Sequence, residues 1–187
     1  MPRNDVILWI DLETTGSSND AKIIEFGGVI TDSSPELKEL STFTTLVDPW
    51  PVDTYEAEVV TQMHYKSGLN EALKAVPLPQ IGEAEKSILK WINDTIGFST
   101  DHIPWGGSGV GHFDSKYIRR DWPYLSKRIT YWVYDVGVMR RMLRLVGIEI
   151  PSEFTEVKTH RALDDALLHA SEARQYLKLL DSYKQFI

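Results

Sequence analysis

Short continuous runs of apolar residues near the start of the chain are typical of β-strands. Residues 6–10, Val-Ile-Leu-Trp-Ile, are apolar throughout, which favours a strand covered on both faces at the centre of an α/β sheet. Residues 23–31 and 43–47 continue the pattern, and a meander of three strands is the simplest interpretation. The pair Gly27-Gly28 in the second run indicates a bulge or a point where another backbone approaches closely.

Helical periodicity replaces the strand pattern in the later part of the chain. The expected helices cover residues 81–95, about 113 until Pro123, 136–146 before a stop at Gly147, and about 160–180. Strands followed by helices mixed with short strands predict an α/β fold, with a mixed central sheet flanked by helices. We expect a single domain over residues 1–187.

Composition excludes several classes of protein. The chain has 187 residues, 27 acidic and 20 basic side chains, a formal net charge of −7 and no cysteine. A disulfide scaffold, a zinc finger and a thiol nucleophile are therefore excluded. The apolar run 6–10 is too short to cross a bilayer, so we expect a cytosolic protein with no membrane association. The acidic balance argues weakly against binding nucleic acid by charge alone.

The sequence Asp11-Leu12-Glu13 directly follows the apolar strand. Side chains alternate along a strand, so Asp11 and Glu13 point the same way and Leu12 points to the other face. Two adjacent carboxylates repel each other unless a cation lies between them. The alternative is a pair of solvated charges where a strand meets a loop.

A glycine-rich segment, residues 106–111, precedes His112-Phe113-Asp114. Glycine lets a backbone approach a ligand closely, but the segment lacks the Gly-Lys-Ser/Thr ending of a phosphate loop. Asp114 then lies at the head of the expected helix. The alternative is a flexible loop with Asp114 as a helix cap.

His160, Asp164 and Asp165 lie where the last helix is expected to begin. His160 and Asp165 do not share a helical face, so we expect His160 in the preceding loop or first turn and Asp165 fixed on the helix. Such a histidine suits a base that moves in when substrate binds. The alternatives are a surface histidine and aspartates that only complement the helix dipole.

Together, the D-x-E, the F-D at a helix start and the H-x4-D resemble the DEDDh 3′→5′ exonuclease family of the ribonuclease H-like superfamily. The order and spacing match over nearly the whole chain. The family spacing selects Asp165 over Asp164, which would then be an outer-shell or capping residue. The resemblance implies two divalent cations, Mg²⁺ or Mn²⁺, held by four carboxylates, with a histidine as general base: Asp11, Glu13, Asp114, Asp165 and His160.

Two further segments resemble the oligoribonuclease branch of that family. They are residues 63–69, where a histidine precedes Ser-Gly-Leu, and residues 9–13 followed by Thr15-Gly16. The resemblance places Thr15 and Gly16 in the substrate site and His64 against the terminal nucleotide. The alternative for His64 is an exposed histidine on a helix.

Other positions depart from that branch. Ser17 stands where oligoribonucleases usually carry a leucine that wedges between bases, and Val110 replaces an asparagine common in related exonucleases. Phe113-Asp114 is more similar to proofreading exonucleases and ribonuclease T. The four carboxylates are unaffected, and the substrate and the branch stay open.

Aromatic residues near these motifs are candidates for holding nucleotides, although packing in the core is the default for any one of them. Trp105, just before the glycine-rich segment, is the first candidate for stacking on the 3′ end. Tyr131 resembles a tyrosine that reaches into the partner's site in oligoribonuclease-like homodimers; the alternative is core packing. Asp135 is interpreted as a helix cap.

The sequence thus predicts a metal-dependent 3′→5′ exonuclease that releases 5′-mononucleotides from short single-stranded oligonucleotides, with RNA favoured, by a two-metal-ion mechanism. One alternative is a proofreading or repair exonuclease that acts on DNA beside a polymerase. A second is an inactive nucleic-acid-binding or scaffolding module.

Overall fold

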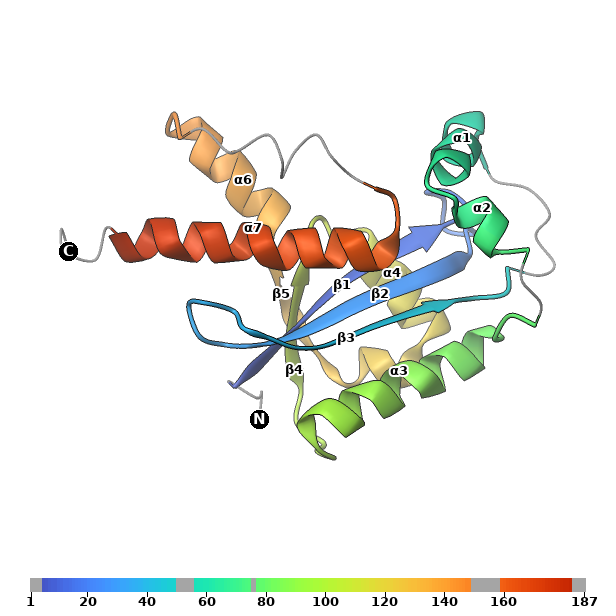
Figure 1. Cartoon of the computed structure of the whole chain (residues 1–187), viewed down its shortest axis with the longest axis horizontal. Helices are drawn as coiled ribbons and strands as arrows, with labels where there is room; N and C mark the ends of the chain where they lie inside the picture. The colour runs from blue at the N-terminus through green and yellow to red at the C-terminus, as the bar shows by residue number, and fades with distance from the viewer. Residues whose placement is uncertain (1–4, 50–55, 75–76, 149–158, 183–187) are drawn as a thin grey trace.

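A mixed five-stranded sheet lies at the centre of the computed structural model, which describes residues 5–49, 56–74, 77–148 and 159–182 (Figure 1). Its strands are β1 (Val6–Thr14), β2 (Ile23–Asp32), β3 (Glu39–Leu46), β4 (Ile103–Gly107) and β5 (Ile129–Asp135), in the order β3-β2-β1-β4-β5. The first three strands form an antiparallel meander, and β4 and β5 run parallel to β1. The predicted meander and mixed sheet are confirmed.

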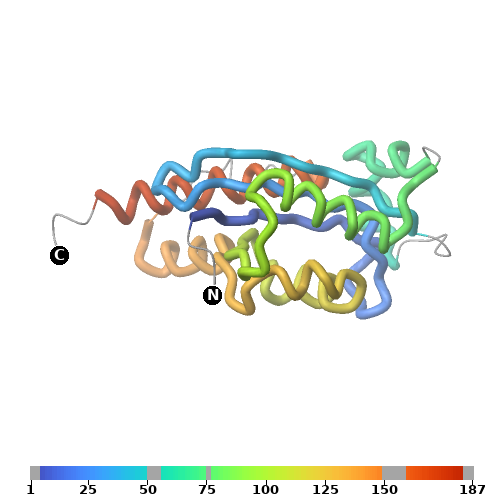
Figure 2. The backbone as a smooth tube through the Cα atoms, turned by 90° about the horizontal axis from the view of Figure 1, so that it is seen from below, coloured from blue at the N-terminus to red at the C-terminus, as the bar shows by residue number. Residues whose placement is uncertain are grey.

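Seven described helices surround the sheet: α1 (Glu58–Lys66), α2 (Leu69–Ala72), α3 (Ile81–Ile96), α4 (Asp114–Asp121), α5 (Pro123–Ser126), α6 (Val136–Leu145) and α7 (Ala162–Ser182). Figure 2 shows α3 in front of the strands and α7 behind them. The predicted helix over 81–95 and the stop at Gly147, which adopts a φ of 77°, are confirmed. Helix α4 ends at Asp121, two residues before Pro123, and Pro123 is the first residue of α5. In the described parts of the chain, no helix has the length and apolar content needed to cross a membrane.

The two faces of the sheet carry different side chains. On β1, Leu8, Ile10 and Leu12 join the large core beneath α3, α4 and α5. Ile7 and Trp9 join a second core beneath α6 and α7. Asp11 and Glu13 continue this second set, as the predicted alternation requires. The carboxylates therefore face α7.

Helix α7 begins in direct contact with β2. A Cβ atom added to Gly27 would lie 2.1 Å from the carbonyl carbon of Ala162 and 2.1 Å from the backbone nitrogen of Leu163. A glycine is thus required where the first turn of α7 crosses the strand. The predicted close approach of another backbone at Gly27 is confirmed, and this approach places α7 over the end of β1.

Candidate active site

The two carboxylates of β1 are buried rather than solvated. Asp11 is 8% exposed and Glu13 is 6% exposed. Asp11 Oδ1 lies 3.9 Å from Nδ1 of His169, a buried histidine of α7. Glu13 Oε2 lies 2.9 Å from Nε2 of His64 on α1. The interpretation as two solvated charges at a strand end is therefore wrong.

Asp114 joins the site from the other side of the sheet. It is the first residue of α4, is 3% exposed, and accepts a hydrogen bond of 3.1 Å from the backbone N–H of Leu12 on its Oδ1 atom. That N–H lies between Asp11 and Glu13 in the chain. No side-chain cap is formed at the start of α4, so the interpretation of Asp114 as a helix cap is corrected: its carboxyl group is directed at β1.

The start of α7 completes the cluster. One ligand atom each from Glu13, His160 and Asp165 lies within 4.8 Å of the others. Asp165 is 2% exposed, and His160 precedes the helix, as expected, with a φ of 55°. Asp164 is exposed and accepts a hydrogen bond of 3.1 Å from the Thr159 hydroxyl. The fold thus brings Asp165, and not Asp164, to Glu13.

The donor set of this cluster fits hard divalent cations. Asp11, Glu13, Asp114 and Asp165 are all buried. Carboxylates held together at low exposure repel one another, so the arrangement favours a bound cation that offsets their charge. Oxygen ligands are those that Mg²⁺ and Mn²⁺ prefer. The cluster of Glu13, His160 and Asp165 could therefore bind a metal ion, and the set of four carboxylate ligands that the motifs imply stays a prediction.

An open cavity gives access to the start of α7. It has a volume of about 870 Å³ and lies between α1 and the residues that precede α7. His160, Arg161 and Lys66 are on its wall. A substrate that reached His160 from solvent would meet two cationic side chains there.

His64 is a buried residue beside Glu13. Its side chain is fully buried, at 0% exposure, and contacts the Glu13 carboxylate. The expected exposed helix histidine is therefore wrong. The expected contact of His64 with the terminal nucleotide stays a prediction, and in this structure the enclosed ring contacts Glu13 instead.

Thr15 and Gly16 form a tightly held turn directly after β1. The Thr15 hydroxyl accepts a hydrogen bond of 2.9 Å from the Lys22 amide. The Gly16 carbonyl accepts one of 2.6 Å from the Thr14 hydroxyl. A Cβ atom at Gly16 would lie 2.1 Å from the Glu56 carboxylate. The turn is fixed beside Glu13, and its role toward substrate stays a prediction.

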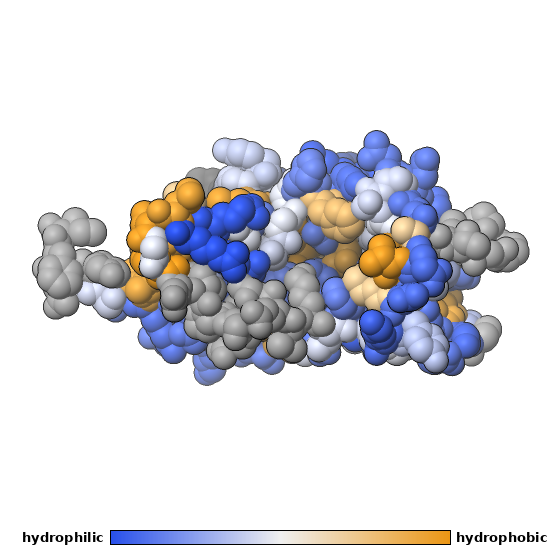
Figure 3. Space-filling view, turned by 90° about the horizontal axis from the view of Figure 1, so that it is seen from above, coloured by the Kyte–Doolittle hydropathy of each residue, from blue (hydrophilic) through white to orange (hydrophobic). Residues whose placement is uncertain are grey.

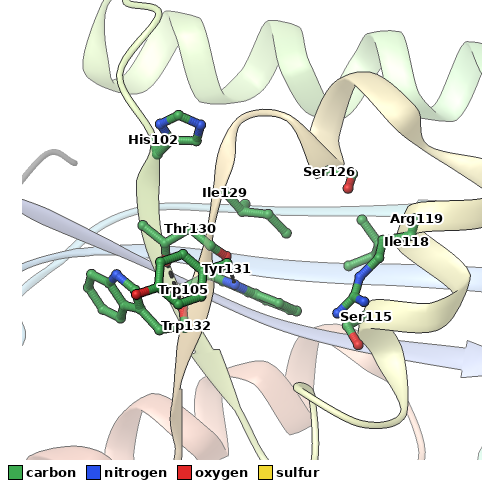
Figure 4. Close-up of a pocket in the computed structure, with 10 residues that line it drawn as sticks. All are labelled: His102, Trp105, Ser115, Ile118, Arg119, Ser126, Ile129, Thr130, Tyr131 and Trp132. Carbon is green, nitrogen blue, oxygen red and sulfur yellow. Dashed lines mark hydrogen bonds between the residues drawn. The ribbon is translucent and has the colours of Figure 1, made fainter. Parts of the chain in front are cut away.

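Trp105 and Tyr131 both line a cavity of about 750 Å³ between α4 and the edge strand β5 (Figure 4). The Trp105 indole is 2% exposed and donates a 2.9 Å hydrogen bond to the Thr130 carbonyl. Trp105 thus packs in the core, and the expected stacking of a base on it stays a prediction. Tyr131 is 96% exposed, so the alternative of core packing is wrong for it. The cap at Asp135 is confirmed by its 3.0 Å bond from the Val138 amide.

Two residues beside the site, His169 and Glu25, were not predicted from the sequence. His169 follows Asp165 by one helical turn, and this spacing was a usable signal. Glu25 is a charged residue inside the apolar run of β2, 1% exposed and paired with Arg161. The hydrogen bond from Arg161 to Glu25 is the main cause of a raised Arg161 pKa. An isolated carboxylate in an apolar strand was the signal for a buried partner.

Comparison with known proteins gives concordant matches. The profile of the RNase_T family, described as exonuclease, matches residues 8–104. The oligoribonuclease of Vibrio vulnificus is 31% identical over 182 residues, which are 91% of this chain and 92% of that protein. The oligoribonuclease of Hahella chejuensis is 28% identical over 186 residues, 94% of this chain and 95% of that protein.

Solved structures of exonuclease I share the fold. E. coli exonuclease I in complex with a dT13 oligonucleotide superposes with a TM-score of 0.66 at 17% identity. A zinc-bound complex of the same enzyme with single-stranded DNA gives 0.62, also at 17% identity. The matches cover 95% and 98% of this chain, which spans only 43% and 42% of those chains. The likeness confirms the predicted ribonuclease H-like fold class.

Proposed function

The chain belongs to the RNase_T family of exonucleases, and we propose that it is a metal-dependent 3′→5′ exonuclease acting on short single-stranded oligonucleotides, RNA above all, to release 5′-mononucleotides. Family membership makes it a hydrolase of nucleic acids and agrees with the three acidic motifs. The observation that carries the proposal is the meeting of Glu13, His160 and Asp165 within 4.8 Å. The family profile ends at residue 104, and this geometry supports including the later motif of His160 and Asp165 in the site.

Two observations favour a short strand as the proposed substrate: the similarity to oligoribonucleases and the negative net charge of the chain. The oligoribonucleases that resemble this chain match it over more than nine tenths of its length. A net charge of −7 is poorly suited to holding a long strand by its phosphates. The cationic side chain of Lys66, on the wall of the open cavity, suits a few phosphates instead. Thr15 and Gly16 are proposed to shape the side of the site next to β1.

The proposed mechanism assigns each role to a residue of the chain. Asp11, Glu13, Asp114 and Asp165 would hold two divalent cations, Mg²⁺ or Mn²⁺. Such a pair, when bound, supplies charge stabilisation for the attacking and leaving oxygens. His160 lies beside the Glu13 and Asp165 carboxylates on the wall of the cavity, and we assign it the role of general base, which would accept the proton of the attacking water.

The decisive experiment follows hydrolysis of labelled oligonucleotides. Purified protein is incubated with RNA and with DNA from dinucleotide to 24-mer, with Mg²⁺ or Mn²⁺, and the products are resolved as a ladder. We expect mononucleotides to accumulate from the 3′ end, fastest on the shortest RNA. Faster degradation of long DNA would favour the proofreading alternative. Failure on every substrate with Mn²⁺, at the level of an Asp11→Asn control, would leave the inactive binding module.

A homodimer is proposed as the assembly. Tyr131 is 96% exposed on the edge strand β5, where a second copy could be reached. Exposed apolar side chains also gather over α6, seen as orange in Figure 3: Val138, Met142, Leu145 and Val146. Such a patch is typical of a protein interface.

Light scattering at micromolar concentration tests the assembly, with a mass near twice 21.4 kDa expected. A monomeric mass at full activity would contradict the homodimer.

The cytosolic location of the protein stays a prediction, to be checked by cell fractionation.

A further inference from the structure

The start of α7 is tied to β2 by a single buried carboxylate, that of Glu25. Arg161 donates from Nη2 to Glu25 Oε1 at 2.7 Å and from Nε to the two oxygens at 3.1 and 3.2 Å. The backbone N–H of Ala162 donates to Oε2 at 3.0 Å. One carboxylate therefore pairs with a guanidinium and also satisfies an open amide in the first turn of the helix.

These contacts connect the strand to the part of α7 that carries the chemistry. Glu25 is the cross-strand partner of Glu13, so both carboxylates point from the sheet toward α7. Arg161 directly follows His160, and its carbonyl accepts the backbone N–H of Asp165 at 3.0 Å. A shift of Arg161 would therefore move His160 and Asp165 together.

His160 has a backbone conformation that needs support. Its φ of 55° is in the left-handed region, which costs a residue other than glycine free energy unless its surroundings fix it. On the solvent side the support is a longer bond of 3.3 Å from the Arg161 amide to the Thr159 hydroxyl. The buried support comes from Glu25, which is 1% exposed.

We propose that Glu25 is a positioning residue that acts through Arg161 and the Ala162 amide to hold His160 and Asp165 against Glu13. This inference rests on the proposed exonuclease function. Glu25 is enclosed between strand and helix, so its loss should slow turnover without weakening substrate binding. We expect Glu25→Gln to lower kcat by about 10-fold to 100-fold, the size of effect that small misplacements of catalytic groups produce, with KM changed by less than about threefold.

Helix α7 offers a matched control further along its length. Arg140 of α6 donates to Glu172 at 2.7 Å from Nε and at 2.5 Å from Nη2. Glu172 is also buried, at 0% exposure, and also accepts the Tyr176 hydroxyl. Glu172→Gln thus removes the same charge from the same kind of Arg–Glu pair, which here lies further along α7. We expect a comparable fall in melting temperature, with kcat within about twofold of the wild type.

The experiment measures kcat, KM, Mn²⁺ affinity and hydrogen exchange in the full chain, wild type and both variants. Steady-state rates are taken on a labelled trinucleotide with Mn²⁺, and Mn²⁺ affinity by calorimetry. The exchange rates of the amides from Ala162 to Asp165 should rise in Glu25→Gln and stay unchanged in Glu172→Gln. Equal kcat in the two variants, or unchanged exchange in Glu25→Gln, would overturn the proposal.

Two outcomes need further measurements: a Glu25→Gln variant that does not fold, and a wild-type protein without exonuclease activity. If Glu25→Gln fails to fold because it leaves a buried cation, the double variant Glu25→Gln/Arg161→Gln removes both charges; it should fold and keep the low kcat, and recovery of wild-type kcat would refute positioning. If the wild type degrades no oligonucleotide, the exonuclease function itself has failed, and the exchange rates still decide whether Glu25 holds the start of α7.

Discussion

The two faces of the central sheet differ most where β2 meets the start of α7. Beneath α3, α4 and α5, the core is large and aromatic: Phe26 lies edge-on to Trp91 and Trp122 at 6.4 and 5.8 Å, and Phe43 stacks on Trp91 at 5.5 Å. Beneath α7, small residues such as Gly27 bring the helix backbone against β2. A second apolar cluster packs beneath the rest of α7, and buried carboxylates lie at the start of that helix.

Because of this difference, the residues that stabilise the fold and the residues of the proposed active site lie in different parts of the molecule. Aromatic rings contribute large buried areas to folding, and their indole N–H groups are satisfied, as in the 2.9 Å bond from Trp91 to Ser41. Clustered carboxylates oppose folding unless they are compensated. Substitutions beneath α3 should therefore change stability with activity preserved, whereas substitutions of the carboxylates beside the start of α7 should change activity first.

The sharpest test of this comparison is Asp11→Asn. We expect activity to fall by much more than the 10- to 100-fold typical of outer-shell changes around a metal, because a ligand is lost. The melting temperature in EDTA should stay equal or rise, since one repelling charge is gone. Rates on a labelled trinucleotide and thermal melts check both. Added Mn²⁺ should stabilise the wild type more than the variant; equal stabilisation would contradict a metal site at Asp11.

The second test is His160→Ala. Loss of a general base should lower kcat by about 10²- to 10⁴-fold, while calorimetry should still detect Mn²⁺ binding to the carboxylates. His102, an exposed histidine at the cavity beside β5, provides the control, and His102→Ala should leave kcat unchanged. Wild-type turnover in His160→Ala at neutral pH would refute the general-base role.

Much of the α7 face could be predicted from the sequence because its signals are local. The alternation of Asp11 and Glu13 and the placing of His160 ahead of a helix that carries Asp165 follow from strand and helix periods alone. The Gly27-Gly28 pair in a strand predicted that another backbone approaches closely, and at Gly27 this is the backbone of α7. Each of these is a property of a few neighbouring residues.

Pairings between distant segments could not be predicted. His64 is buried on Glu13, Trp105 is enclosed by β5, and Glu25 meets Arg161 only because β2 and α7 pack together. The sequence shows that a charge or an indole exists, while its partner depends on the tertiary packing. The same reason explains why Tyr131, for which core packing was the alternative interpretation, lies exposed on an edge strand.

The third test compares adjacent glycines on β2 that face opposite sides. A Cβ atom at Gly27 would meet the α7 backbone at 2.1 Å, whereas one at Gly28 would meet the Phe26 ring at 2.8 Å and the Trp91 ring at 3.0 Å. Both alanine substitutions overpack the structure and should cost about 1–3 kcal/mol of unfolding free energy. Only Gly27→Ala should displace α7, lowering kcat by about 10-fold. Urea unfolding and trinucleotide rates measure the pair, and equal losses of kcat would break the division between the faces.

The smallest effect on activity is expected for Trp91→Phe, deep in the aromatic core. The change removes the indole N–H that donates to the Ser41 hydroxyl and leaves part of the ring volume empty. Both losses destabilise the fold, together by about 1–3 kcal/mol, which corresponds to a fall in melting temperature of several degrees for a domain of this size. Because Trp91 packs on the face away from Asp11 and Glu13, kcat should stay within about twofold of the wild type. Ser41→Ala separates the two contributions, since it removes only the acceptor. A loss of kcat in Trp91→Phe as large as that in Gly27→Ala would show that the aromatic core positions the site as well as stabilising it.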